Sequence, residues 1–298
     1  MEIRTAELGE LQALMKKELA GLYPAEELAA IVRGLFSHLT GLTASEMVLE
    51  KGRKMSESEI HYLQRSLKRL KEFEPLQYIT AVAWFHDLEF KVSPSVLIPR
   101  PETEELVEWI LADHASTDGL VKILDIGTGS GCIAISLKKK LPKAEVHAID
   151  ISRDALSVAE ENADRLDAEV SFRRADILDT EARSALPQYD IIVSNPPYVT
   201  PADRKKMMRN VTDHEPSLAL FVEEDDPLRF YREIIMFSAH HLEKGGRLYL
   251  ECNEGNAKDV AALLNLNGFA DVELRKDMQG KERMVLGVPP SPRLRWTK

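Results

Sequence analysis

Residues 191–198 are Ile191, Ile192, Val193, Ser194, Asn195, Pro196, Pro197 and Tyr198. The apolar run from Tyr189 to Val193 predicts a strand that is buried on both faces, as the strands of parallel sheets are. Proline cannot donate to a strand ladder, so the strand has to end at this point. Open α/β sheets bind their ligands at the carboxyl ends of their strands. The stretch therefore predicts a parallel α/β sheet with a candidate site at the end of a central strand.

The same stretch carries the groups needed to hold a planar NH2 group. Asn195 Oδ1 and the Pro196 carbonyl can accept both hydrogens, Tyr198 can pack its ring against the group, and Pro197 stiffens the loop. An amide nitrogen is a poor nucleophile because its lone pair is delocalised. Two acceptors would aim it at an electrophile and stabilise the charge that develops on it. The alternative is a plain Asn-Pro turn without a function.

An alternation of strands and helices along residues 99–298 predicts the rest of this domain. We expect strands at 121–126, 146–150, 170–176, 189–193 and 246–251, with final strands near 272–274 and 284–286. Helices are expected between them, at 132–139, 152–166 and 260–266. Strands separated by helices imply right-handed crossovers and a largely parallel sheet covered on both faces. The predicted fold class is α/β and Rossmann-like.

The residues before this domain have a different character. Residues 1–73 have leucines and alanines at helical spacing and predict a small helical bundle, in which Ser45 and Ser56 stand where N-caps belong. Nothing in this bundle is of a catalytic type, and a role in docking a substrate protein is a hypothesis only. Residues 74–98 contain short aromatic and β-branched runs around His86 and Asp87, which predict a β-hairpin linker that includes Tyr78–Thr80. In the segment that follows, Glu102 or Thr103 is expected to cap a helix.

The loop after the first expected strand is rich in glycine. It comprises Gly127, Thr128, Gly129, Ser130 and Gly131. Glycines let a backbone approach a ligand closely. The spacing is wrong for the Gly-x-Gly-x-x-Gly loop of a dinucleotide site, because Cys132 stands where the last glycine belongs, and no phosphate-loop motif is present. An NAD-dependent dehydrogenase is therefore disfavoured.

Two further strand ends carry acids. Asp150 lies where a carboxylate would bind two ribose hydroxyls, and Asp176 could accept from an adenine amino group, with Ile151 and Ile177 as apolar faces for the ring. A nucleoside without phosphates, an acid for its ribose and a positively charged sulfur next to Asn195 together describe S-adenosylmethionine. The sequence thus predicts a methyltransferase whose product is S-adenosylhomocysteine.

Composition restricts the other possibilities. The chain has 298 residues and a net charge of −10, which counts against nucleic acid as the main partner because such binding usually needs a basic surface. No apolar run is long enough to span a membrane and no signal pattern begins the chain, so a cytoplasmic location is expected. The two cysteines, Cys132 and Cys252, lack metal-ligand spacing, so we expect core residues and no metal site. The protein is expected to be monomeric.

From about Pro75 to the C-terminus, the sequence resembles the HemK/PrmC protein-(glutamine-N5) methyltransferases, which modify peptide-chain release factors. The most specific stretch is residues 96–104, Val-Leu-Ile-Pro-Arg-Pro-Glu-Thr-Glu. Further matches are Pro75–Ile79, Asp125–Gly131, Val193–Tyr198, Glu215-Pro216 with Ala219-Leu220, and Lys276-Asp277 with Gly280 and Arg283. The box at 195–198 is shared with DNA adenine methyltransferases, so it indicates the chemistry and not the substrate.

The resemblance implies a class I S-adenosylmethionine-dependent methyltransferase fold and a substrate. The substrate would be the glutamine of the Gly-Gly-Gln motif in class I release factors, held by residues 195–198, with Arg100 also expected near the ligand. Residues 127–131, Asp150, Ile177 and Asn195 would contact the cofactor. No dedicated base is expected, because the proton that the product amide loses is acidic.

Three places depart from the family pattern, namely His86-Asp87, Val222–Glu224 and Cys252-Asn253. They affect the expected loop geometry and not the chemistry. Two rival functions stay open at this stage. One is a DNA or RNA adenine amino-methyltransferase, which would need a basic groove and a base-flipping pocket. The other is a catalytically silent, cofactor-binding regulatory protein, against which the intact Asn195 box argues.

Overall fold

The computed structural model describes residues 7–115, 119–205, 207–223 and 225–289. The chain divides into two compact units, one comprising Met1–Ala81 with Met208–His214 and the other Val82–Met207 with Glu215–Lys298. We describe each unit by itself. The expected boundaries of 1–73, 74–98 and 99–298 stay a prediction. No helix among the described residues is long and apolar enough to cross a membrane.

The N-terminal unit is a small bundle of helices, as its leucine and alanine spacing predicts. Its elements are α1 (Leu8–Leu19), α2 (Ala25–Thr40), α3 (Ala44–Leu49), α4 (Glu57–Lys71), α5 (Leu76–Thr80) and the short α11 (Arg209–Thr212). Residues from α1 to α5 share one apolar core that includes Leu8, Leu35, Phe36, Leu63 and Ile79. The sequence pattern and the packing therefore agree for this unit.

Capping side chains fix where two of these helices begin. Ser56 caps α4, and its hydroxyl and Glu59 exchange hydrogen bonds in a capping box, as predicted. The prediction for Ser45 is wrong, because Thr43 caps α3. Thr43 has Glu46 three residues later to complete a capping box, whereas Ser45 has the apolar Val48 at that position.

A β-hairpin begins the second unit. Strands β1 (Val82–Phe85) and β2 (Leu88–Lys91) pair antiparallel through a two-residue turn at His86 and Asp87. Both turn residues have positive φ, 51° and 62°, as the preferred two-residue hairpin turn requires. Tyr78–Thr80 do not belong to the hairpin as predicted. They lie in α5, which begins after Pro75 and ends at Ala81 in the left-handed conformation.

The turn geometry predicts a stabilising substitution. Asp87 is exposed, so Asp87→Gly removes no packing, and glycine adopts a positive φ without a steric penalty from a Cβ. We expect the free energy of unfolding to rise by about 0.5–1 kcal/mol. Asp87→Ala is the control and is expected to lower it, because alanine keeps the Cβ and loses the short polar side chain. Urea unfolding of the three proteins measures both effects, and a less stable glycine variant would contradict the left-handed turn.

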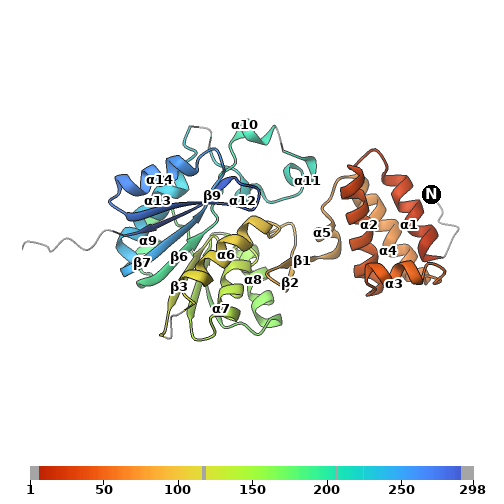
Figure 1. The fold of residues 1–298 in the computed structure, drawn as a ribbon, viewed down its shortest axis with the longest axis horizontal. Coiled ribbons are helices and arrows are strands. Elements are labelled where there is room, and N and C mark those ends of the chain that lie inside the picture. The colour runs from red at the N-terminus through yellow and green to blue at the C-terminus, as the bar shows by residue number, and fades with distance from the viewer. Residues whose placement is uncertain (1–6, 116–118, 206, 224, 290–298) are drawn as a thin grey trace, which may run out of the picture. The chain divides into compact units, whose positions relative to one another are not determined.

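A seven-stranded sheet forms the centre of the second unit (Figure 1). Its strands are β3 (Lys122–Ile126), β4 (Glu145–Asp150), β5 (Val170–Arg174), β6 (Tyr189–Ser194), β7 (Leu242–Glu251), β8 (Ala270–Lys276) and β9 (Glu282–Val288). They are ordered β5-β4-β3-β6-β7-β9-β8. Neighbours from β5 to β7 pair parallel, and β9 runs antiparallel to both β7 and β8. The predicted largely parallel sheet is confirmed.

Helices cover both faces of this sheet (Figure 1). Those of the second unit are α6 (Pro101–Asp113), α7 (Cys132–Lys140), α8 (Arg153–Arg165), α9 (Thr180–Ser184), α10 (Pro201–Arg204), α12 (Ser217–Leu220), α13 (Arg229–His241) and α14 (Ala257–Leu266). One apolar core contains residues of α6, α7 and α8, and a second contains residues of α13 and α14. The sequence reasoning did not identify α13. Cys132 and Cys252 are buried and free, as expected.

The pairing of the central strands aligns their carboxyl ends. Ile191, Ile192 and Val193 on β6 are fully buried, which confirms the predicted burial of this strand. Ile126, the last residue of β3, is level with Ser194 at the end of β6 and with Ile149 near the end of β4. The connection after β3 leads to β4 on one side, whereas β6 lies on the other, so the strand order reverses between β3 and β6. Ligands of open α/β sheets bind at such a point.

Candidate active site

A cavity of about 440 Å³ opens at the carboxyl ends of β3, β4, β5 and β6. This volume is within the range that small-molecule sites occupy. Its wall includes the predicted site residues Gly127, Gly129, Asp150, Ile151, Asp176, Ile177, Asn195, Pro196 and Pro197. It also includes Val96 and Leu97 from the stretch 96–104, and residues that the sequence did not single out, such as Leu218 and Phe230. The sheet register thus brings the expected residues from four strand ends to one place.

Two glycines give this cavity a wall of bare backbone. Gly127 and Gly129 have φ of 76° and 55°, and a Cβ built on either would meet no atom within 4 Å. The space that their missing side chains leave is therefore open. The amides of Gly127 and Thr128 donate to the Ile149 carbonyl at 2.8 and 3.1 Å, which ties the loop to β4. A ligand can approach the backbone here where any side chain would obstruct it.

Asp150 is held in place by two backbone amides. Gly129 N–H donates to Oδ2 at 2.9 Å and Ser152 N–H donates to Oδ1 at 2.8 Å. Burial raises the pKa of Asp150, and the hydrogen bonds from Ser152 and Gly129 oppose that change. Each carboxylate oxygen has a second lone pair that these bonds leave available. Asp150 can therefore accept from two vicinal hydroxyls.

Asp176 follows β5 and also lies in the cavity wall. Its Oδ1 accepts from Leu178 N–H at 2.8 Å, so its carboxylate is fixed by the chain that follows it. Ile177 is buried and Ile151 is 39% exposed, and both contribute apolar surface to the wall. An acceptor between two apolar side chains suits the amino edge and the faces of a purine ring.

The other residues of the glycine loop have contacts within the protein and do not line the cavity. Thr128 Oγ1 donates to the buried Asp125 at 2.6 Å, and Ser130 is buried. Gly131 has φ of 81°, and a Cβ there would lie 2.9 Å from Ile135 Cδ1 and 3.2 Å from Ala159 Cβ. Gly131 therefore permits close packing of α7 against α8. Contacts between these three residues and a cofactor stay a prediction.

The loop after β6 brings its carboxamide to the same cavity. Ser194 Oγ donates to the Ile126 carbonyl at 2.7 Å, which fixes the end of β6 against β3. Asn195, Pro196 and Pro197 then line the cavity. Tyr198 does not line it, because its ring packs against the apolar core that includes α13 and α14. A contact between Tyr198 and a substrate stays a prediction.

Arg100 also lies outside the cavity wall. Its Nη2 donates to Glu215 Oε1 at 2.5 Å, and the Glu215 side chain is 1% exposed. Ile98 N–H donates to Glu215 Oε2 at 3.3 Å. Arg100 thus ties the segment before α6 to the segment that contains Pro216, Leu218 and Ala219 of the cavity wall. Its role here is to hold the wall together, and a direct role in ligand binding stays a prediction.

Two side chains next to Asn195 were missed in the sequence. Asn195 Nδ2 donates to Thr103 Oγ1 at 3.2 Å, and Thr103 Oγ1 donates to Glu251 Oε2 at 2.6 Å. The expectation that Glu102 or Thr103 caps α6 is wrong. Arg100 is the N-cap residue, without a side-chain hydrogen bond, and the Thr103 hydroxyl is directed to Glu251 instead. The Ile-Pro-Arg-Pro-Glu-Thr-Glu stretch and the glutamate that ends β7 were the available signals.

The His86-Asp87 turn, one of the three departures from the family pattern, is described above. The other two, at Cys252-Asn253 and Val222–Glu224, have backbone hydrogen bonds to other segments. Cys252 is fully buried, and its N–H donates to the Arg283 carbonyl at 2.7 Å. Val222 N–H donates to the Val199 carbonyl at 3.0 Å, which ties this segment to the chain after the Asn195 box. Glu224 lies outside the described residues.

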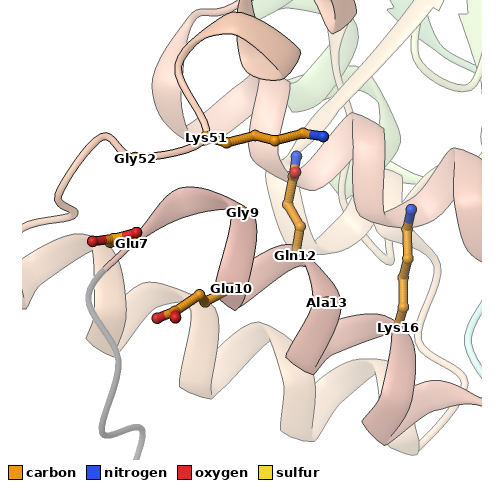
Figure 2. A pocket seen from close by; sticks show the side chains of 8 residues that line it. All are labelled: Glu7, Gly9, Glu10, Gln12, Ala13, Lys16, Lys51 and Gly52. Carbon is orange, nitrogen blue, oxygen red and sulfur yellow. The ribbon is translucent and has the colours of Figure 1, made fainter.

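A second, shallower hollow lies in the N-terminal unit and has a volume of about 430 Å³. Figure 2 shows the side chains of Gln12, Lys16 and Lys51 on one part of its wall and the carboxylates of Glu7 and Glu10 on another. None of the predicted site residues lies in it. The hypothesis that this unit docks a substrate protein stays a prediction.

Comparisons with known proteins agree with these features. Residues 107–214 match a family model described as the methyltransferase small domain, and residues 10–80 match the PrmC N-terminal domain. The release factor glutamine methyltransferase of Bacteroides thetaiotaomicron is 42% identical over 278 residues, which are 93% of this chain and 99% of that protein. The protein of the same name from Flavobacterium psychrophilum is 42% identical over 90% of this chain and 94% of its own length. The chain belongs to the release factor glutamine methyltransferases.

A solved structure supports the fold of this family member. A methyltransferase from Pyrococcus furiosus has a TM-score of 0.51 and 17% identity, and the match covers 76% of this chain and 99% of that one. The class I methyltransferase fold predicted from the sequence is thereby confirmed. The methyl donor of the enzyme is S-adenosylmethionine, and the product is S-adenosylhomocysteine.

The residues of the cavity fit this donor. The open space beside Gly127 and Gly129 admits a ligand against bare backbone. Asp150 offers free lone pairs to ribose hydroxyls, and the apolar side chains of Ile151 and Ile177 flank the acceptor Asp176. When bound, S-adenosylmethionine supplies an electrophilic methyl group on a positively charged sulfur. Among the residues that the structure describes, the wall of the cavity contains no cationic side chain, which agrees with a positively charged ligand.

The two kinds of glycine in the loop predict opposite consequences for an added methyl group. Gly129→Ala puts a Cβ into the open space of the cavity, so we expect cofactor affinity to fall by about 10-fold or more, with the free energy of unfolding lowered by about 1 kcal/mol for the positive φ. Gly131→Ala adds a clash with Ile135 and Ala159, so its main effect is expected on stability, about 2–3 kcal/mol. Calorimetric titration with S-adenosylhomocysteine and urea unfolding separate the two. Equal losses of affinity in both variants would contradict the assignment.

The buried Glu251 predicts a pH-dependent stability. Burial raises the pKa of Glu251 from 4.5 to about 7, because the charged form loses its hydration. A raised pKa means that the folded protein binds this proton more tightly, so the stabilisation is present below pH 4.5 and lost as the pH rises through 7. Glu251→Gln is uncharged at every pH. We expect it to raise the free energy of unfolding at pH 8 by about 2 kcal/mol and at pH 5 by less than about 1 kcal/mol, as urea unfolding measures. An equal increase in the free energy of unfolding at both pH values would contradict the raised pKa of Glu251.

Proposed function

We propose that the enzyme transfers a methyl group from S-adenosylmethionine to the side-chain amide nitrogen, N5, of the glutamine in the Gly-Gly-Gln motif of class I release factors. The observation that carries this proposal is the placement of Asn195 and Pro196 in the wall of the cavity, at the end of β6. The Nδ2 of Asn195 is engaged by Thr103, which leaves Oδ1 as the acceptor for a substrate. The family to which the chain belongs supports both the reaction and the protein substrate.

The residues of the site act mainly by positioning. Asn195 Oδ1 and the Pro196 carbonyl accept the two hydrogens of the substrate NH2 and fix its rotation, so that the nitrogen faces the methyl group. The same two acceptors stabilise the positive charge that develops on the nitrogen during transfer. The two prolines have no backbone N–H, so neither adds a donor next to these acceptors. The proton is lost from the methylated amide, whose excess proton is acidic, and no side chain is assigned as a base.

The position of Asn195 at the reversal point of the sheet explains why it can serve both ligands. Gly127 follows β3 and Asn195 follows β6, and these strands are neighbours whose last residues are level. The Asn195 carboxamide therefore lies next to the glycine loop that follows β3. A substrate amide held by Asn195 and Pro196 thus lies beyond the carboxyl ends of the central strands, next to the cofactor site.

Methyl transfer to three acceptors tests the proposal. Labelled S-adenosylmethionine is incubated with a purified class I release factor, with its Gly-Gly-Gln→Gly-Gly-Ala variant and with duplex DNA. We expect label on the wild-type factor alone. In the same assay, Asn195→Ala is expected to lose about 10²- to 10³-fold in rate while cofactor binding stays measurable, because it removes one acceptor of the developing charge.

Other outcomes distinguish the rival functions. If duplex DNA is labelled, the assignments of the fold and the cofactor stand, and the substrate is an adenine amino group instead of a glutamine. Cofactor binding without label on any acceptor would favour the catalytically silent regulatory protein. Label on the Gly-Gly-Ala variant would place the reaction on another residue of the factor. The expectations of a monomer, of weak nucleic-acid binding and of a cytoplasmic location stay predictions.

A further inference from the structure

A buried chain of hydrogen bonds joins Asn195 to Glu251. It runs from Asn195 Nδ2 to Thr103 Oγ1 at 3.2 Å and from Thr103 Oγ1 to Glu251 Oε2 at 2.6 Å. Thr103 is 3% exposed and Glu251 is 1% exposed. Neither residue lines the cavity. Their polar groups are nevertheless arranged around the one side chain to which the proposed function assigns the substrate amide.

Four secondary structure elements position the residues of this hydrogen-bonded chain. Ser194 on β6 is level with Leu250 on β7, so the residues that follow them, Asn195 and Glu251, lie beside each other. Thr103 lies in the first turn of α6. The backbone carbonyl of Glu251 accepts from Tyr231 Oη of α13 at 3.1 Å, which fixes the end of β7 from the other face of the sheet. Glu251 and Thr103 are therefore positioned by a strand and a helix, and Asn195 directly follows the end of a strand.

The hydroxyl of Thr103 has only one proton to donate. That proton is directed to the Glu251 carboxylate at 2.6 Å, the short distance typical of a hydrogen bond to a charged acceptor. The Thr103 oxygen then has only lone pairs left for Asn195, so the side of the carboxamide that faces it has to be the NH2. The carbonyl oxygen, Oδ1, consequently points away from Thr103.

We propose that Thr103 and Glu251 are positioning residues that orient the Asn195 carboxamide, so that Oδ1 and not the NH2 is presented to the substrate. The inference rests on the proposed function for the identity of the substrate amide, but the orientation itself is a property of this chain alone. A carboxamide turned by 180° would present two donors to the substrate NH2, and neither could accept its hydrogens. The Thr103 hydroxyl and the Glu251 carboxylate, which also has a side-chain hydrogen bond with Asn195, thus decide together whether Asn195 can bind the reacting group.

The charge on Glu251 controls this orientation. As a carboxylate, Glu251 can only accept, and the proton of Thr103 is committed to it. When Glu251 is protonated, it becomes a competing donor, and Thr103 is free to donate to Asn195 Oδ1 instead. The pKa of Glu251 is raised to about 7, mainly by burial and also by the nearby charge of Glu102, while the hydrogen bond from Thr103 and the charge of Arg283 oppose the rise. Five further groups interact with it, namely Asn195, Tyr198, Tyr231, Cys132 and Cys252.

Kinetics of matched variants test the inference. In the methyl-transfer assay at pH 8, Thr103→Val keeps the shape of the side chain and loses the hydroxyl, so we expect kcat to fall by about 10²-fold, the cost of a misplaced reacting group. Thr103→Ser keeps the hydroxyl and is expected to stay within about 3-fold of the wild type. Affinity for S-adenosylhomocysteine is expected to change by less than about 3-fold in both. A merely structural role would affect binding and turnover together.

The pH profile adds a second readout. We expect kcat of the wild type and of Thr103→Ser to fall as the pH drops from 9 to 6 through a value near 7, because Glu251 gains its proton. Glu251→Gln should be impaired at pH 8 and show no such fall. Urea unfolding of every variant confirms that it is folded. The inference is overturned if Thr103→Val turns over like the wild type, or if Thr103→Ser is impaired as strongly as Thr103→Val.

An observation that does not need turnover keeps this test separate from that of the function. The side-chain amide of Asn195 is assigned in ¹⁵N-labelled protein by its loss in Asn195→Ala. We expect its two protons to shift with a midpoint near pH 7 in the wild type and in Thr103→Ser, to shift less in Thr103→Val, where only the direct interaction of Asn195 with Glu251 is left, and not to shift in Glu251→Gln. If no release factor is methylated but these shifts appear, the proposed orientation of Asn195 is supported and the proposed substrate is wrong. If the factor is methylated and the amide signals are the same in all variants, the orientation mechanism is wrong.

Discussion

The parallel pairing of β3 with β6 is the constraint on which the rest of the site depends. It makes Ile126 level with Ser194, and the Ser194 hydroxyl secures that register with a hydrogen bond of 2.7 Å to the Ile126 carbonyl. A shift by one residue would turn the buried side chains of β6 to the opposite face. The bare backbone at Gly127 and Gly129 and the Asn195 carboxamide would then no longer line the same cavity at the carboxyl ends of the strands. The position of Asn195 in the cavity therefore depends on the register that the buried side chains of Ile191, Ile192 and Val193 require.

The site also contains a group that the fold would be more stable without. Glu251 is 1% exposed, and burial raises its pKa to about 7, so its charged form costs free energy at neutral pH. Arg283 is the cation that lowers this pKa, but its Nε donates to Asp277 at 2.9 Å, so it is shared with another buried acid. A buried acid without a full counter-charge is common at functional sites and rare elsewhere. Glu251 accepts the proton of the Thr103 hydroxyl. Through this hydrogen bond it orients the Asn195 carboxamide, whose Oδ1 has to accept from the substrate.

The fold and most of the cavity could be predicted from the sequence, because they depend on local patterns. The apolar run of β6, the bare glycines 127 and 129 and the acids at 150 and 176 each mark a strand end that a parallel sheet brings to one edge. What could not be predicted depends on contacts between distant residues. Thr103 resembles an N-cap in sequence, and only the proximity of Glu251, 148 residues later, shows its real partner. Tyr78–Thr80 have the composition of a strand, but Pro75 and the bundle core favour a helical turn.

The division between these two groups of residues has a chemical reason. The residues that we expect to hold the cofactor line the cavity through backbone or through side chains at the ends of strands, where the sequence pattern marks them. The acceptor for the substrate has to satisfy a stricter condition, because a carboxamide has a donor end and an acceptor end of nearly the same shape. The backbone of residues 195–198 cannot choose between them, and neither can the rigidity of the two prolines. That choice needs a group on another element whose own proton is already committed, and in this enzyme the Thr103 hydroxyl, held by Glu251, meets that condition.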